Sequence, residues 1–119
     1  MPRPRKPRFV CQHPLISAFF PKEESLIDGR RGEVTLSIEG LEAIRLADLE
    51  GLDQGAGAVA MNVSRPTFSR ILSEARKIVA EALVTGKILR IKGGTYELCP
   101  MDWCRREGTY GFRKCKRRG

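Results

Sequence analysis

The spacing of apolar residues predicts one long amphipathic helix in the second half of the chain. From Arg65 to about Val84, at about 3.6 residues per turn, one side of this helix is apolar and the other is polar and cationic. Ser64 is a good N-cap, Pro66 fits the first turn, and Gly86 stands near the C-terminal stop. The residues of the apolar side are Phe68, Ile71, Leu72, Ala75, Ile78, Val79, Ala82 and Leu83.

An earlier predicted helix, residues 38–50, is less regular. Ser37 is its candidate N-cap and Gly51 its stop. Charged residues interrupt its apolar set, so either these charges pair with one another or one side of the helix meets a partner. The apolar set is Ile38, Leu41, Ile44 and Leu49, and the interrupting charges are Glu42, Arg45 and Asp48.

A short helix over about residues 54–61 is predicted between these two. Together with the long helix it forms the two helices of a helix-turn-helix. Asp53 can cap it, and Asn62 tolerates the left-handed conformation that a tight turn needs. Gly55 and Gly57 cost this helix roughly 1 kcal/mol each relative to alanine, so packing must hold it. The residues predicted to make the contact between the two helices are Ala58, Met61, Val63, Phe68 and Ile71.

The polar face of the long helix is the candidate DNA-reading surface. The leading end of such a helix brings N–H groups and partial positive charge toward phosphates, and an arginine can bind guanine through two hydrogen bonds in the major groove. The alternative is an ordinary capped helix pair with a solvated basic face. The predicted DNA-binding residues are Ser64, Arg65, Thr67, Ser69, Arg70, Ser73, Arg76 and Lys77.

Two short β-prone runs follow within residues 88–98, on either side of Gly93 and Gly94. This glycine pair suits the positive φ angles of a type I′ turn, so the sequence predicts a hairpin. As a wing beside the helix-turn-helix, the hairpin would present Arg90 and Lys92 to backbone phosphates. The alternative is a hairpin that only closes the core.

Positive charge is concentrated at the two ends of the chain. The net charge is +8, of which residues 1–8 contribute +4 and residues 90–119 contribute +6, whereas residues 9–89 sum to −2. Basic arms bind polyanions by releasing counterions, although basic ends can also serve solubility alone. The prolines among the first eight residues oppose a helix, so we interpret this segment as a basic arm. Its candidate phosphate-contacting residues are Arg3, Arg5, Lys6 and Arg8.

With 119 residues, the chain is long enough for one small core. The predicted fold is mainly α, a three-helix helix-turn-helix domain followed by a short wing-like β-hairpin, with basic N- and C-terminal tails. The segments are residues 1–33, a basic arm and docking loop; 34–98, the helix-turn-helix domain with its hairpin; and 99–119, a cysteine-containing basic tail. The residues expected to dock the loop are Phe9, Val10, Leu15, Phe19 and Phe20.

The four cysteines and the single histidine are candidate metal ligands. Cys99, Cys104 and Cys115 lie near the C-terminus, and Cys11 or His13 could complete a tetrahedral zinc site if the N-terminal segment folds back. The spacing lacks a C-x2-C pair, so plain thiols and a redox-responsive pair stay open as alternatives. No other cofactor is indicated.

An enzyme is not expected from this sequence. The chain has one histidine, no phosphate-cradling glycine loop and no Ser/His/Asp arrangement. It has no targeting segment and no run approaching the roughly 20 apolar residues that span a bilayer. We therefore expect a soluble cytoplasmic protein with no membrane partner.

Four stretches carry a resemblance to a known family: "MPRPRKPR", "LSIEGLEAIRLADLEGL", "VSRPTFSRIL" and "KILRIKGGTYEL". Over about residues 1–98 the chain resembles the small prokaryotic predicted DNA-binding proteins called uncharacterised protein family 0251. The helix-turn-helix of that family is similar to region 4 of bacterial sigma factors. The resemblance implies a three-helix DNA-binding domain.

Together these patterns favour a sequence-specific protein that binds double-stranded DNA, a transcriptional regulator in which Arg65, Ser69 and Arg70 read bases. Because single helix-turn-helix units bind weakly, a homodimer is a candidate state. The alternative is a sigma-like interaction module that docks on RNA polymerase, or an RNA-binding protein that uses its basic arms.

Overall fold

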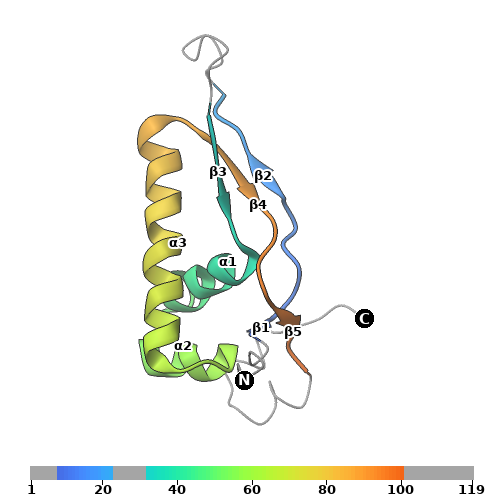
Figure 1. The fold of residues 1–119 in the computed structure, drawn as a ribbon, viewed down its shortest axis with the longest axis vertical. Helices are drawn as coiled ribbons and strands as arrows, with labels where there is room; N and C mark the ends of the chain where they lie inside the picture. Colours follow the sequence, from blue (N-terminus) through green and yellow to red (C-terminus); the bar gives the residue numbers. More distant parts are fainter. Residues whose placement is uncertain (1–7, 23–31, 101–119) are drawn as a thin grey trace, which may run out of the picture.

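A long helix with two shorter ones across its N-terminal half forms the main body of the protein. The computed structural model describes residues 8–22 and 32–100. The long helix is α3 (Arg65–Thr85), and the shorter ones are α1 (Ile38–Ile44) and α2 (Gln54–Met61) (Figure 1). A π-helical segment, η2 (Arg45–Leu49), continues α1. None of the described helices is both long and apolar enough to cross a membrane.

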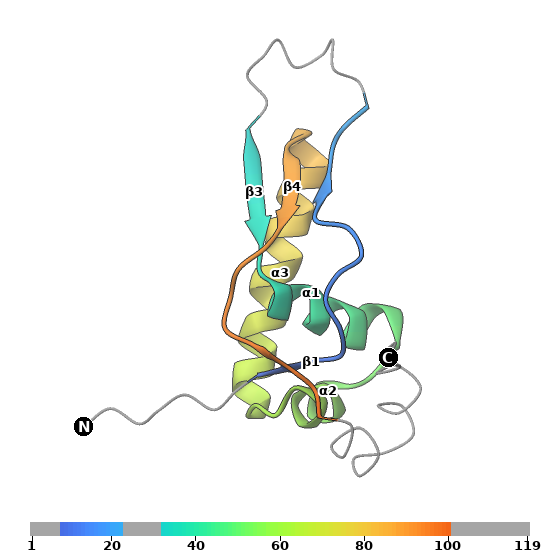
Figure 2. The ribbon, with the colours of Figure 1, turned by 90° about the vertical axis from the view of Figure 1, so that its right-hand side faces the viewer.

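Short strands form two small sheets. Strands β2, β4 and β3 make a three-stranded sheet that lies beside the C-terminal half of α3, and β1 pairs with β5 near α2 (Figures 1 and 2). The strand bounds are β1 (Phe9–Val10), β2 (Ala18–Phe19), β3 (Glu33–Leu36), β4 (Ile88–Ile91) and β5 (Glu97–Leu98).

The predicted helix starts are confirmed. In each case the side chain of the N-cap residue accepts a hydrogen bond from the backbone N–H three residues later, which satisfies a group that the helix itself leaves without a partner. Asn62 adopts the left-handed conformation with φ of 60°, and Gly86 ends α3 with φ of 71°. The three cap pairs are Ser37 with Gly40 (3.0 Å), Asp53 with Ala56 (2.8 Å) and Ser64 with Thr67 (3.3 Å).

Helices α2 and α3 meet where the ring of Phe68 lies against Gly57. Phe68 is fully buried, and a Cβ atom added to Gly57 would lie 2.4 Å from its Cζ atom. Such a distance is far inside van der Waals contact, so only glycine lets α2 come this close to the ring. The glycine that weakens α2 locally is therefore required by the packing. Around this contact lie the other buried residues of the core: Ala43, Leu46, Ala58, Met61 and Leu72.

The predicted hairpin at residues 88–98 is wrong. Strand β4 is the central strand of its sheet, antiparallel to β2 and parallel to β3, whereas β5 pairs with β1 in the other sheet. Gly93 and Gly94 do have positive φ angles, 77° and 105°, but they lead the chain from one sheet to the other. Parallel strands need a long crossover, and here the three helices between β3 and β4 provide it.

The side chains of α3 that face the sheet form a second group of buried residues. Ala75 packs there with Leu36 of β3 and Ile91 of β4. This contact and the Phe68 contact hold α3 at two levels along its length. The opposite, polar side of the helix is left toward solvent.

The π-helical segment changes which leucine of the first helix is buried. Leu46 is 1% exposed, whereas Leu49, which the spacing places on the apolar side, is 76% exposed. The backbone N–H of Glu50 donates to the carbonyl of Arg45 at 2.8 Å, five residues back. This wider turn shifts the helix face relative to the regular α-helical period.

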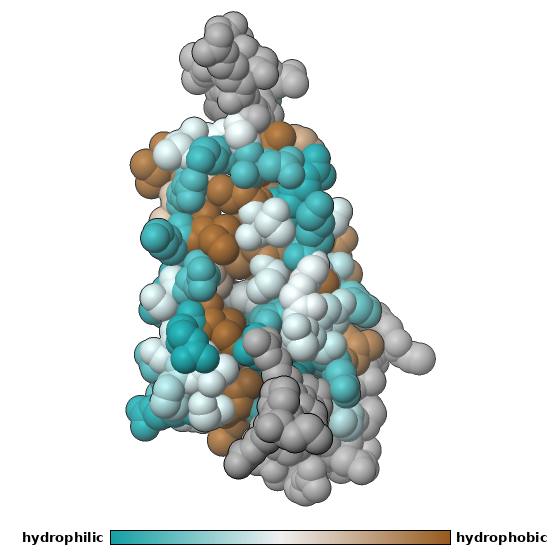
Figure 3. Space-filling model, in the orientation of Figure 1, coloured by the Kyte–Doolittle hydropathy of each residue, from teal (hydrophilic) through white to brown (hydrophobic). Residues whose placement is uncertain are grey.

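Docking of the N-terminal segment is confirmed only in part. Phe9 and Val10 are buried, but Leu15, Phe19 and Phe20 are mostly exposed. At the far end of α3, Leu83 is also exposed although it belongs to the predicted apolar side. Figure 3 shows hydrophobic residues at the surface around this part of α3.

The Gly57–Phe68 contact predicts opposite effects for two glycine substitutions in α2. Gly57→Ala should destabilise the fold by about 1–3 kcal/mol, because the new methyl group meets the buried ring. Gly55→Ala should stabilise it by about 0.5–1 kcal/mol, because its Cβ would meet only the Asp53 carboxylate at 3.4 Å and alanine favours helix. Urea unfolding of the two variants measures both changes, and equal effects would contradict the packing.

Candidate nucleic-acid interface

The first turn of α3 is fixed by its own side chains. The Ser64 hydroxyl donates to Thr67 Oγ1 at 2.9 Å and accepts from the Thr67 backbone N–H. Pro66 stands in the same turn, where its missing N–H has no helical partner to lose. Two of the predicted DNA-binding residues, Ser64 and Thr67, are thus explained by helix initiation.

The exposed cations of α3 follow one side of the helix. Arg65, Ser69, Ser73 and Lys77 succeed one another at intervals of four residues, and Arg70 lies beside them, one turn before Ser73. Arg65, Arg70, Ser73 and Lys77 are exposed, and Ser69 is half-buried. Among the residues that the structure describes, no carboxylate forms an ion pair with Arg65, Arg70 or Lys77. This surface, which we call the cationic face, brings five of the predicted DNA-binding residues together.

Arg76 is held by another part of the fold. Its guanidinium donates to both carboxylate oxygens of Asp48 in η2, at 2.6 and 3.1 Å. That hydrogen bond lowers the pKa of Asp48 below its usual value and raises the pKa of Arg76. The guanidinium is thus turned toward η2, so we leave Arg76 out of the cationic face.

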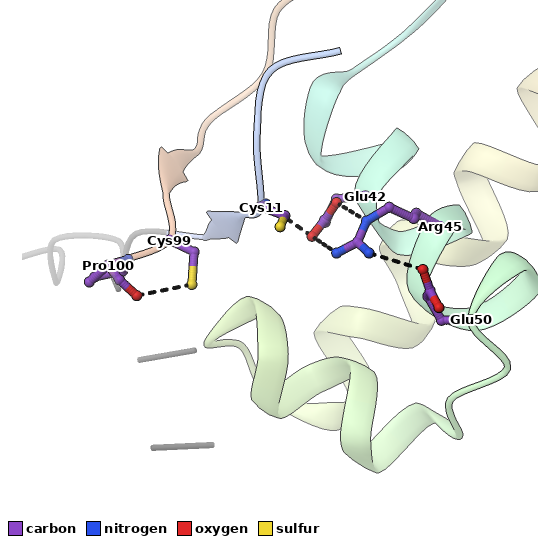
Figure 4. A network of polar contacts seen from close by, with 6 residues as sticks. All are labelled: Cys11, Glu42, Arg45, Glu50, Cys99 and Pro100. Atoms are coloured by element: carbon purple, nitrogen blue, oxygen red, sulfur yellow. Dashed lines mark hydrogen bonds and ion pairs between the residues drawn. The ribbon is translucent and has the colours of Figure 1, made fainter. Parts of the chain in front are cut away.

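The other charges of the first helix also pair. Arg45 donates to the Glu42 carboxylate at 2.7 and 2.9 Å and forms an ion pair with Glu50 at 3.4 Å. The first alternative suggested by the sequence is confirmed, because Glu42 and Arg45 pair with one another (Figure 4). Asp48 pairs with Arg76 of α3 within the same chain, and a partner for this helix stays a prediction.

Arg8 is the point at which the basic arm joins the folded domain. Its guanidinium forms an ion pair with Glu39, a buried carboxylate that also accepts a hydrogen bond from the Thr95 backbone N–H at 2.7 Å. Arg8 and Arg70 line the same groove of ≈ 440 Å³, between α3 and the start of α1. Arg8 therefore joins the arm to the domain through Glu39, and its predicted contact with a phosphate stays a prediction. The predicted contacts Arg3, Arg5 and Lys6 lie outside the described residues.

The wing predicted after α3 has no counterpart in this fold. Arg90 belongs to the central strand β4, where it forms an ion pair with Glu33 at 3.0 Å and lies over the ring of Phe20. Lys92, just after the strand, is exposed. Arg90 is thus paired within the sheet at a partly exposed position, and phosphate contacts by Arg90 and Lys92 stay predictions.

The candidate metal ligands are brought together in part. Cys11 and Cys99 are both buried in one cluster with Phe9, where the pairing of β1 with β5 brings the two ends of the domain together. His13 instead lies against Tyr96, with its Nδ1 atom 3.2 Å from the tyrosine hydroxyl. No group of three or more metal-binding side chains occurs within the described ranges, and Cys104 and Cys115 lie outside them.

Three features of this site escape sequence reasoning. Position 57 must be glycine because the ring of Phe68, eleven residues later, lies against it. This contact can be seen only when α2 and α3 are placed together. The anchoring of Arg8 by Glu39 and the capture of Arg76 by Asp48 join distant segments. Of these features, only the ion pair of Asp48 has a signal in the sequence, because Asp48 is one of the charges that interrupt the apolar pattern of the first helix.

The Asp48–Arg76 ion pair predicts a measurable shift in titration. In Arg76→Gln the pKa of Asp48 should rise toward its usual value of 3.8. Because the carboxyl pKa is lowered in the folded state, the pair contributes stability above the unfolded pKa and loses it as pH falls through the folded value. NMR titration of the carboxyl carbon tests this, and an unchanged Asp48 pKa in the variant would refute the bond.

Comparison with known proteins shows the family of the chain. Residues 1–99 match the family described as "Protein of unknown function DUF134". The chain is similar to the UPF0251 protein Teth39_0655 of Thermoanaerobacter pseudethanolicus, with 50% identity over 104 residues that cover 86% of this chain and 85% of the relative. It is also similar to a UPF0251 protein of Pelotomaculum thermopropionicum, with 50% identity over 109 residues that cover 91% and 81%.

A third relative is longer than this chain. The UPF0251 protein Rru_A1194 of Rhodospirillum rubrum is 53% identical over 94 residues, which cover 79% of this chain and 64% of the relative. No solved structure matches the chain. The match along residues 1–99 and the identities to these relatives lead to one conclusion: the chain belongs to the UPF0251 (DUF134) family of proteins of unknown function.

Proposed function

We propose that this protein binds double-stranded DNA as a transcriptional regulator and reads base sequence with the cationic face of α3. In this proposal α2, the turn at Asn62 and α3 act as a helix-turn-helix, with α3 in the major groove. The groove is about 12 Å wide, which is enough to admit one helix.

The distribution of ion pairs is the observation that supports this proposal most. Elsewhere in the described part of the chain, most cations lie beside a carboxylate, and these are Arg8, Arg45, Arg76, Lys87 and Arg90. Arg65, Arg70 and Lys77 share one helix side without an ion pair among the described residues. A helix side whose cations form no ion pair with a described carboxylate is suited to a polyanion.

The start of α3 adds to the attraction of this side for DNA. The helix N-terminus carries a partial positive charge, and Arg65 is its first residue. Arg65 and Arg70 have the planar donor groups that bind guanine through two hydrogen bonds, and Ser69 lies one turn after Arg65. In the proposal these three residues read bases, whereas Ser73 and Lys77 bind the backbone.

The anchor at Arg8 supports a role for the basic arm on the same duplex. The Glu39 ion pair holds the root of the arm in the groove that Arg70 also lines. Arg3, Arg5 and Lys6 follow directly toward the N-terminus. In the proposal they bind phosphates near the helix and raise affinity by counterion release, without reading sequence.

Selection from a random double-stranded oligonucleotide library tests base reading by α3. The protein should enrich a sequence motif, and Arg70→Ala should lose discrimination at one base position by about 1–3 kcal/mol, because a bidentate contact is removed. Arg76→Ala is the matched control on the same helix and should enrich the unchanged motif, because Arg76 is bound to Asp48.

Deletion of residues 1–7 separates affinity from sequence reading in the same experiment. The shortened chain should bind all duplexes more weakly, with a flatter salt dependence, and should enrich the same motif. The proposal fails if the full chain enriches no motif, or if Arg70→Ala and Arg76→Ala enrich the same one. Binding that depends on the arm alone would favour an RNA-binding or interaction module instead.

A further inference from the structure

A groove with an apolar lining lies between α3 on one side and β3 with the start of α1 on the other. Its volume is ≈ 440 Å³, within the range of about 300–1,000 Å³ that small-molecule sites occupy. Ile71 and Ile78 of α3 line it in half-buried positions, together with the buried Leu36 and Ala75. Figure 3 shows hydrophobic residues between α3 and the sheet, with hydrophilic residues beside them. The apolar group of a small ligand can therefore be removed from water here.

Four charged side chains also line this groove, and two of them pair with each other. Arg8 forms an ion pair with the buried Glu39. Arg70 and Glu74 stand one turn apart on α3, both are exposed, and neither forms an ion pair in the part of the chain that the structure describes. At this spacing, a cation that precedes the carboxylate is the less favourable order for a mutual pair. The groove therefore offers one positive and one negative charge beside its apolar lining.

We infer that this groove binds a small zwitterionic ligand with an apolar side chain, of which an apolar α-amino acid is the simplest. The carboxylate of the ligand binds the guanidinium of Arg70, and its ammonium group binds the carboxylate of Glu74. Both contacts are charge-assisted hydrogen bonds, which are stronger than neutral ones. Because an α-amino acid carries both charges on one carbon, it can reach two side chains one turn apart while its apolar side chain packs on Ile71 and Ile78.

Glu74 distinguishes the groove from the cationic face of α3. A phosphate bound to Arg70 inside the groove would lie close to the Glu74 carboxylate, and like charges repel. A cation would meet the same difficulty with Arg70, whereas a zwitterion satisfies both side chains. The site itself does not depend on DNA binding. Because Arg70 belongs to both surfaces, the ligand and a DNA base would compete for its guanidinium, a consequence that rests on the proposed function.

NMR titration of the full chain without DNA tests the site, with leucine, methionine and phenylalanine as separate probes. At least one of them should shift the methyl signals of Ile71 and Ile78 saturably. Three analogues of leucine each lack one part of the ligand: isocaproate lacks the ammonium group, isoamylamine lacks the carboxylate, and glycine lacks the apolar side chain. Each should bind about threefold to tenfold more weakly than leucine, because one contact is lost.

Substitutions at exposed positions of α3 test the two charged contacts without disturbing the core. Arg70→Gln and Glu74→Gln should each weaken binding of the amino acid by about threefold to tenfold. Arg65→Gln is the matched control, because it removes the same charge from an exposed position of the same helix that does not line the groove. Its affinity for the amino acid should equal that of the unaltered chain.

The inference is overturned if none of the three amino acids shifts these signals, if isocaproate binds as tightly as leucine, or if Arg70→Gln and Arg65→Gln bind equally well. Failure of the proposed function would appear instead in the oligonucleotide selection, which contains no amino acid, so the two failures are distinguishable. With the enriched duplex, a saturating amount of the amino acid should lower the affinity of the unaltered chain for DNA. An unchanged affinity would overturn the shared use of Arg70.

Discussion

The contact between Phe68 and Gly57 sets the position of α3. The ring is fully buried one turn after Ser64, so it fixes the direction in which the first turn of α3 leaves the core. A Cβ atom at position 57 would meet the Phe68 ring, so the ring or one of the two helices would have to shift. The loss of helix propensity at this glycine is small beside the cost of a displaced ring. The glycine that lowers the helix propensity of α2 is thus the residue that lets the Phe68 ring of α3 pack into the core.

Ion pairs within the fold determine which of its described cations already lie beside a carboxylate. The sequence has a large excess of cations, but Arg8, Arg76 and Arg90 are each bound to a carboxylate from a distant segment. These pairs connect the arm, η2 and the sheet to the rest of the domain. The cations of α3 that form no ion pair with a described carboxylate, Arg65, Arg70 and Lys77, lie on one side of the helix. The proposed function follows from this division of charges rather than from net charge alone.

Local features could be predicted from the sequence, and features that join distant segments could not. Helix caps, the left-handed Asn62 and the positive φ angles of Gly93 and Gly94 depend on a few neighbouring residues, and all are present. The hairpin prediction is wrong because a β-prone run does not specify the strand with which it pairs. Strand β4 pairs with β2 and β3 instead of β5. The role of Arg8 was missed for the same reason, because Glu39 lies far along the chain. The cationic face was found because helical period alone defines it.

The central claim is that the N-terminal half of α3 contacts DNA bases. Its most direct test is an NMR titration of the protein with the duplex enriched from the random library. The largest changes in backbone amide and arginine Nε signals should fall within residues 64–73, with Arg65 and Arg70 foremost, and should be absent at Arg76 and Arg90. Changes confined to the sheet or to the basic arm, with α3 unaffected, would contradict the claim.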